Sequence, residues 1–214
     1  MMIEAVIWDF GGVLTTSPFE AFARFETERG LPRDIIRRTN AANHFENAWA
    51  KFERAEVDLD TFDKLVAAES LARGAEVRGR DVVQLLSGDP RPEVVEALRR
   101  VKQHFKTGCI TNNLPANAIG SSAGRALYVA ETMALFDHVI ESAKIGLRKP
   151  DPRIYRMMVD ALGVDPNNCV YLDDLGVNLK PARDMGMRTI KVIDGPRNID
   201  SQQNSLWFGL RTGG

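Results

Sequence analysis

Cysteine, net charge and long apolar runs are what this sequence has little of. Its only two cysteines among 214 residues, Cys109 and Cys169, lie inside apolar segments with no C-x-x-C spacing. We therefore expect two buried free thiols in a reducing compartment and no disulfide framework. The formal net charge is -1, so the chain has no overall basic field, and we expect no nucleic-acid partner.

No segment approaches the apolar length of a transmembrane helix. The first residues run directly into an apolar strand pattern, without the basic and apolar regions of a signal peptide. We therefore expect no membrane partner and a cytoplasmic protein. With 44% apolar residues, the composition is that of an ordinary globular chain.

Five short apolar runs, each bounded by turn or helix signals, predict strands at residues 3–8, 107–110, 136–140, 169–172 and 189–193. Amphipathic helical patterns lie between the later runs, at residues 92–101 and 152–162 for example. Strands that alternate with helices favour right-handed crossovers and a parallel sheet covered on both faces. The predicted fold class is α/β, with a Rossmann-like doubly wound sheet.

The region after the first strand is different, because residues 18–86 contain helical patterns and no convincing strand. Turn signals flank it, with Ser17 expected as the N-cap of the first helix and Pro18 at its first position. We therefore expect an α/β catalytic core of residues 1–15 and 88–214. Residues 16–87 would form a helical cap, or lid, inserted after the first strand.

Polar residues follow the first, second and fourth predicted strands, and a K-P-D-P sequence opens a helix between them. The set consists of Asp9, Thr111, Asn112, Lys149, Asp173 and Asp174. Each alone has an ordinary explanation as a turn residue or helix cap. Their order favours a common site, since the carboxyl ends of parallel strands meet at one edge of a sheet, where ligands bind.

These residue types are the ones that phosphoryl transfer requires. A carboxylate such as Asp9 can attack phosphorus and hold the group as an acyl phosphate, which splits one hard displacement into two easier ones. Mg²⁺ held by Asp9 and the Asp173–Asp174 pair would screen the repulsion between nucleophile and phosphate. Thr111 and Lys149 would donate to the phosphoryl oxygens. The sequence therefore predicts a small phosphorylated substrate.

The order of these motifs resembles the haloacid dehalogenase superfamily, whose members are mostly Mg²⁺-dependent phosphatases that work through an aspartyl-phosphate. The likeness rests on the D-F-G-G-V-L run from Asp9, on Thr111-Asn112, Lys149-Pro150 and Asp173-Asp174, and covers residues 3–194. The insert lies where this family places a lid. Residues 172–186 are similar to the phosphatase-like N-terminal domain of soluble epoxide hydrolases.

The resemblance implies a role for each residue. Asp9 would be the nucleophile and a Mg²⁺ ligand, together with the backbone carbonyl of Gly11 and the carboxylate of Asp174. Asp173 would act on the metal through water or support its neighbour. The phosphoryl group would be bound by Thr111, Asn112 and Lys149, and Lys149 would share the catalytic work with Asp9.

Gly11 departs from the family pattern. Family phosphatases usually carry an aspartate two residues after the nucleophile, which protonates the leaving alkoxide and then activates water. Loss of such general acid–base help costs on the order of 10² to 10⁴ in rate. Three hypotheses therefore stay open: a phosphatase with a weakened general acid, a 2-haloacid dehalogenase, and a non-catalytic phosphate-binding protein. The retained Asp173–Asp174 pair argues against the dehalogenase, which would need no Mg²⁺.

Two further expectations concern other activities and partners. In soluble epoxide hydrolases the epoxide chemistry belongs to a second, α/β-hydrolase domain with a G-x-S-x-G elbow, and 214 residues leave no room for it. We therefore expect no epoxide hydrolysis. An apolar patch, Leu206-Trp207-Phe208, could pack on the core or on a second subunit, which keeps a homodimer open.

Overall fold

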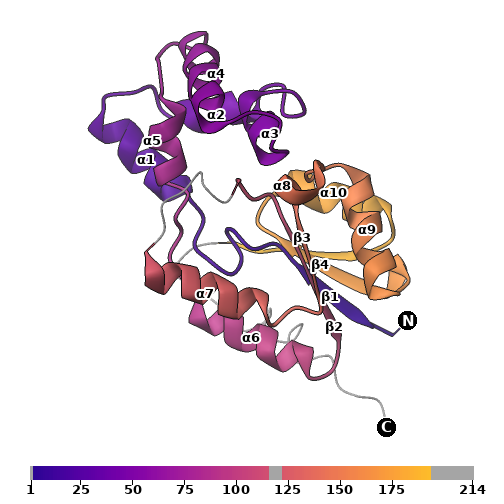
Figure 1. The fold of residues 1–214 in the computed structure, drawn as a ribbon. Coiled ribbons are helices and arrows are strands. Elements are labelled where there is room, and N and C mark those ends of the chain that lie inside the picture. The colour runs from indigo at the N-terminus through magenta and orange to yellow at the C-terminus, as the bar shows by residue number, and fades with distance from the viewer. Residues whose placement is uncertain (1, 116–121, 194–214) are drawn as a thin grey trace.

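The computed structural model describes residues 2–115 and 122–193, which build a five-stranded parallel sheet flanked by helices (Figure 1). The order of the strands is β3-β2-β1-β4-β5. Their bounds are β1 Ala5–Trp8, β2 Lys106–Thr111, β3 His138–Glu141, β4 Cys169–Asp173 and β5 Arg188–Lys191. All five predicted strands are confirmed, with ends shifted by one or two residues.

The first strand lies at the centre of the sheet, and the chain then builds outward on both sides of it, as a doubly wound fold does. In this register Trp8 is opposite Cys109 on β2 and Leu172 on β4. The backbone N–H of Asp9 donates to the carbonyl of Leu172 over 2.8 Å. The residues that follow β1 and β4 therefore lie side by side at one edge.

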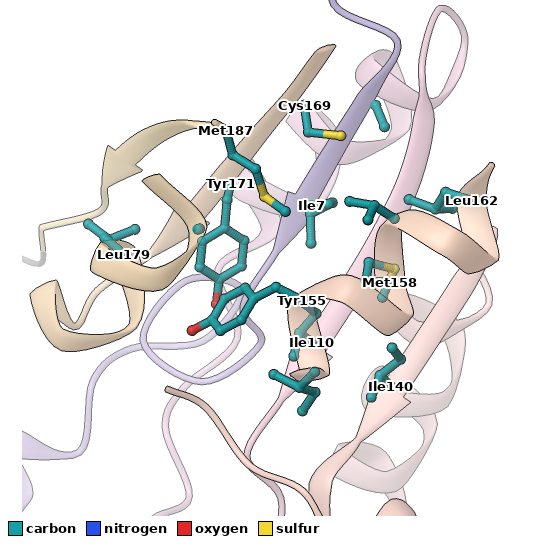
Figure 2. Close-up of a cluster of buried hydrophobic side chains, with 14 residues drawn as sticks. Ile7, Ile110, Ile140, Tyr155, Met158, Leu162, Cys169, Tyr171, Leu179 and Met187 are labelled. Atoms are coloured by element: carbon teal, nitrogen blue, oxygen red, sulfur yellow. The ribbon is translucent and has the colours of Figure 1, made fainter. Parts of the chain in front are cut away.

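Helices cover both faces of the sheet (Figure 1). One layer is α6 Pro92–Lys102 and α7 Ala123–Met133, and the other is α8 Ser142–Ile145, α9 Pro152–Leu162 and α10 Gly176–Asp184, with a short 3₁₀ turn at Pro166–Asn168 before β4. Figure 2 shows Tyr155 and Met158 of α9 turned toward Ile7 and Ile110 of the sheet. Trp8 belongs to the cluster on the opposite face, as the alternation of side chains along a strand requires.

Both cysteines lie in these strands. Cys109 and Cys169 are buried and free, which confirms the prediction of two buried thiols.

Five helices lie between β1 and α6 and are called here the helical insert: α1 Phe19–Glu28, α2 Ile35–Ala41, α3 Ala48–Glu53, α4 Leu59–Leu71 and α5 Gly79–Gln84. They share a separate apolar cluster in which the rings of Phe52 and Phe62 stack with centroids 4.2 Å apart. Helix α9 matches its predicted bounds. The division into core and cap as functional units stays a prediction.

The two connections between insert and sheet run along each other. Thr15 forms an antiparallel bridge with Pro90, and the N–H of Thr16 donates to the carbonyl of Asp89 over 2.9 Å. The prediction that Ser17 caps α1 is wrong, because the helix begins at Phe19 without a side-chain cap. The Ser17 hydroxyl is instead turned toward the sheet edge, where it donates to Asp174 over 3.4 Å.

No helix in the described part of the chain has the length and apolarity needed to cross a bilayer. The patch Leu206-Trp207-Phe208 lies outside the described residues, so the homodimer stays a prediction.

Candidate active site at the carboxyl edge of the sheet

A buried ammonium group lies at the centre of the site. The side chain of Lys149 is 1% exposed, and its Nζ lies 2.7 Å from Oδ1 of Asp9 and 2.9 Å from Oδ2 of Asp173. Burial alone would lower the pKa of this lysine, but the charges of Asp173 and Asp9 outweigh burial and raise the pKa above its usual value. Lys149 is therefore a fixed positive charge that joins two strand ends.

Asp173 is satisfied by donors of the protein. Its Oδ2 accepts from Lys149, from the Tyr171 hydroxyl at 2.5 Å and from Nδ2 of Asn178 at 3.1 Å, and its Oδ1 accepts from the N–H of Leu175 at 2.8 Å. A carboxylate with this many donors is an anchor for its neighbours. The two roles expected for Asp173, action on the metal through water and support of its neighbour, stay predictions.

Among the described residues, the contacts that hold Asp9 reach one of its two carboxylate oxygens. Its Oδ1 accepts from Lys149 and from the N–H of Phe10 over 2.7 Å. Burial raises the pKa of Asp9 well above its usual value; Lys149 opposes that rise, whereas the charges of Asp173 and Asp174 add to it. A cation beside this carboxylate would relieve both the burial cost and the repulsion.

The carboxylates form a donor set for such a cation. One oxygen from each of Asp9, Asp173 and Asp174 lies within 4.8 Å of the others. The backbone of Gly12, with φ +77°, lies close to the carboxylate of Asp174. A Cβ added to Gly12 would be 2.3 Å from Oδ2 of Asp174. Hard carboxylate oxygens at a partly buried edge suit a divalent metal of the Mg²⁺ or Ca²⁺ type.

The Thr111-Asn112 motif also reaches the site. Thr111 ends β2 and is buried. Both polar atoms of the Asn112 side chain bind the backbone of Lys149: Oδ1 accepts from its N–H over 2.8 Å, and Nδ2 donates to its carbonyl over 3.0 Å. Asn112 therefore fixes the segment that carries the ammonium group. Phosphoryl binding by Thr111 and Asn112 stays a prediction.

The comparison with known families agrees with this geometry. A model of haloacid dehalogenase-like hydrolases matches residues 3–186 of the chain. The chain belongs to this family. The resemblance predicted from the order of the motifs is thereby confirmed, and the chain is a haloacid dehalogenase-like hydrolase with the α/β fold of that family.

Relatives of this hydrolase include two proteins at similar identity. The pig protein named bifunctional epoxide hydrolase 2 is 32% identical over 209 residues, which cover 91% of the chain and 37% of the relative. Phosphatase MT3486 of Mycobacterium tuberculosis (strain CDC 1551 / Oshkosh) is 33% identical over 201 residues, which cover 90% of the chain and 88% of the relative. The hydrolase thus spans well under half of the first relative and most of the second.

Solved structures show the same fold. A haloacid dehalogenase family enzyme from Bacteroides thetaiotaomicron, in complex with magnesium and inorganic phosphate, superposes with a TM-score of 0.60 at 16% identity and covers 92% of this chain and 98% of its own. At that identity the likeness concerns the fold alone.

Gly11 is the position at which the sequence predicts a departure from the family pattern, and the structure leaves room for a Cβ there. A Cβ added to Gly11 would meet no atom within 4 Å, whereas one added to Gly12 would collide with Asp174. Packing among the described residues therefore leaves space for a Cβ at position 11.

The letters G-x-S-x-G, the elbow sequence of α/β-hydrolases, do occur once, at residues 120–124. Ser122 is the N-cap of α7, where its hydroxyl accepts from the N–H of Arg125 over 3.3 Å. A nucleophile elbow would instead place the serine directly after a strand, and residues 116–121 lie outside the described part.

Sequence reasoning missed four residues that line or support this site: Glu53, Arg148, Tyr171 and Asn178. Asn178 lies on the first turn of α10, five residues after Asp173, so its position near the motif was a usable signal. Arg148 directly precedes Lys149. Glu53 carried no local signal, because it reaches the site from the insert.

Proposed function

We propose that the chain is a Mg²⁺-dependent phosphohydrolase of small phosphomonoesters, sugar phosphates among them, that works through a phosphoryl group carried by Asp9. The observation that carries the proposal is the buried Lys149 ammonium between Asp9 and Asp173, with Asp174 on the same edge. Similarity to phosphatase MT3486 supports the phosphatase class.

In this proposal Asp9 attacks phosphorus. The N–H of Phe10 and the Lys149 ammonium both contact Oδ1 of Asp9, so we assign the attack to Oδ2, which accepts no hydrogen bond from the described residues. A bond forms between Oδ2 and phosphorus as the ester P–O bond breaks, and the ester oxygen leaves as an alkoxide that is then protonated by water. Water then hydrolyses the acyl phosphate and restores the carboxylate. Lys149 holds Asp9 in place and offers positive charge to a phosphoryl oxygen.

The metal would be held by Asp9, Asp174 and the backbone carbonyl of Gly11, while Asp173 stays with Lys149. When bound, Mg²⁺ supplies charge that screens the carboxylate from the phosphate. The raised pKa of Asp9, caused by burial and by two neighbouring carboxylates, is the feature that a cation at this place offsets.

Gly11 weakens the general acid in this proposal. With no carboxyl group at that position, an alkoxide must leave unprotonated or take its proton from elsewhere. We therefore propose that substrates with good leaving groups are hydrolysed fastest.

The insert completes the proposed enzyme. Residues 16–87 would act as the cap that selects the substrate, over a core of residues 1–15 and 88–214. The proposal is supported by the separate apolar cluster of α1–α5 and by the paired connections at Thr15 and Pro90.

The test is phosphate release from a panel of aryl and alkyl phosphomonoesters, with Mg²⁺ and with a chelator. We expect release that requires Mg²⁺ and disappears in Asp9→Asn, a variant of the same size that lacks a nucleophilic carboxylate. Absence of release from every member of the panel, with the protein folded and Mg²⁺ present, would overturn the proposal.

Gly11 also motivates a second candidate, a 2-haloacid dehalogenase, because halide leaves without a proton. Halide release from a 2-haloacid in the presence of a chelator, without phosphate release from the panel, would favour it. Binding of a phosphate mimic without either turnover would point to the non-catalytic alternative.

A further inference from the structure

The helical insert contacts the sheet edge through a short ion pair next to Lys149. Nε of Arg148 donates to Oε2 of Glu53 over 2.6 Å, and its NH1 donates to the carbonyl of His44 over 2.5 Å. The side chains of Arg148 and Glu53 are 14% and 13% exposed. A charge-assisted contact that is this well shielded from water differs from the exposed ion pairs on the rest of the surface.

Glu53 also lies close to a second residue of the site. Burial raises the pKa of Glu53, while Arg148, Lys149 and Asn112 hold that rise down. Glu53 is therefore close to Asn112, the residue that binds the backbone N–H and carbonyl of Lys149. One carboxylate of the insert thus pairs with the residue directly before Lys149 and lies near the residue that binds the Lys149 backbone.

The contact continues through the residues around it. Leu114, two residues after Asn112, packs against the apolar cluster of the insert. Asn113 binds the start of α8, where its Oδ1 accepts from the N–H of Ala143 over 3.1 Å. The segment from Thr111 to Leu114 therefore joins the strand end, the Lys149 backbone and the insert in four consecutive residues.

We propose that Glu53 is a positioning residue, which holds Arg148 and Asn112 so that the Lys149 ammonium is placed between Asp9 and Asp173 only while the insert is docked. The proposal rests on the proposed phosphohydrolase function for its kinetic consequence. Its structural consequence, the order of the Lys149 backbone, does not depend on that function.

A positioning role and a purely structural role lead to different kinetics. If Glu53 acts through Lys149, its loss lowers kcat with little change in KM, because the misplaced group acts on the transition state. If Glu53 contacted the substrate directly, KM would rise. If it only held the insert together, the free energy of unfolding would fall while kcat stayed the same.

The test compares Glu53→Ala and Glu53→Gln with Glu56→Ala. Glu56 is a matched control, since its 2.6 Å pair with Arg54 lies three residues away on the same insert and is exposed. We expect Glu53→Ala to lower kcat for an aryl phosphate by about 10- to 100-fold, the cost of a misplaced catalytic group, with KM within about twofold. Glu53→Gln should fall between Glu53→Ala and the wild type.

Hydrogen exchange supplies a readout that needs no activity. The N–H of Lys149 donates to Asn112, and Pro150 and Pro152 have no N–H, so a peptide over residues 146–152 contains few exchanging amides. We expect this peptide to exchange faster in Glu53→Ala than in Glu56→Ala and the wild type. Equal exchange and equal kcat in the two alanine variants would overturn the proposal.

The two proposals fail in distinguishable ways. If the wild type releases no phosphate, the proposed function fails, and the exchange comparison still decides the positioning role. If Glu53→Ala does not fold, Glu53→Gln and Arg148→Lys carry the same comparison, since the first keeps the size of the side chain and the second keeps its positive charge.

Discussion

The buried polar groups of the helical insert and those of the sheet edge are connected in different ways. In the insert, Glu26 accepts from the backbone N–H groups of Asp34 and Ile36, at 2.7 and 3.0 Å. Ser70 likewise accepts from the N–H of Val77 over 2.8 Å. Each of these side chains closes a turn a few residues away along the chain.

At the sheet edge the buried groups bind one another. Lys149 pairs with Asp9 and Asp173, which come from two different strands, and Asn112 from a third holds its backbone. Removing Lys149 leaves two carboxylates without their cation, whereas removing the side chain of Glu26 or Ser70 leaves only backbone N–H groups unpaired. Local caps are therefore expected to affect stability, and the linked charges to affect chemistry as well.

The largest expected effect is that of Lys149→Met. It leaves Asp9 and Asp173 buried without their cation, and the loss of one partner from a buried ion pair costs about 3–5 kcal/mol. We expect that loss in the free energy of urea unfolding, measured with a chelator, together with loss of phosphate release. The control is Lys180→Met, whose exposed pair with Asp184 is worth less than about 0.5 kcal/mol. Similar losses in the two variants would remove the distinction.

A carboxyl group introduced at Gly11 tests whether a general acid is missing at this position. Space for the side chain is available, so we expect Gly11→Asp to raise kcat/KM for an alkyl phosphate, by up to roughly 10² to 10⁴ if general acid catalysis is fully recovered. Aryl phosphate hydrolysis should change less. Gly11→Asn, of the same size but without the acid, is the control, and an equal gain there would refute the explanation.

Asp63→Asn tests a local group of the insert. The Arg78 guanidinium and the N–H of Arg80 bind Asp63, and Arg78 is the main reason that the pKa of Asp63 lies below its usual value. Loss of these charge-assisted bonds should cost about 1–3 kcal/mol of unfolding free energy, with kcat unchanged in the folded protein. A large fall in kcat at full folding would contradict the comparison.

The same variant has a defined pH dependence. Because the folded-state pKa of Asp63 is depressed, its contribution is fully present above the unfolded value of about 3.9. That contribution is lost as the pH falls through the lower folded value. The stability difference between wild type and Asp63→Asn should therefore shrink below about pH 4.

The smallest expected effect on function concerns the reactivity of the two thiols. Burial raises the pKa of Cys169 to about 11 and that of Cys109 further, so neither should react with a thiol reagent in the folded protein at neutral pH. Because both cysteines lie in the sheet, labelling of their thiols along a urea gradient measures the unfolding of the sheet alone. If Asp63→Asn leaves the labelling midpoint unchanged, the insert unfolds separately from the sheet, and a shared shift would show that they unfold together.

Much of the fold was predictable, because the signals are local. The apolar runs around Ile7, Ile110 and Tyr171 predict strands from periodicity alone. Gly163 ends α9 in the left-handed region at the residue expected. The prediction for Ser17 was wrong because its hydroxyl had two possible partners, the start of α1 and the distant Asp174. Only the folded chain shows that it contacts Asp174.

The sequence by itself determined that Asp9, Thr111, Lys149 and the two aspartates at the end of β4 reach one edge, because parallel strands place their carboxyl ends together. Only the tertiary structure decided how they divide the work. Asp173 takes Lys149, Tyr171 and Asn178, and Asn112 binds backbone. Glu53 arrives from the insert. These pairings join residues far apart in the chain, and they depend on side-chain rotamers and on where the insert docks, which no local pattern encodes.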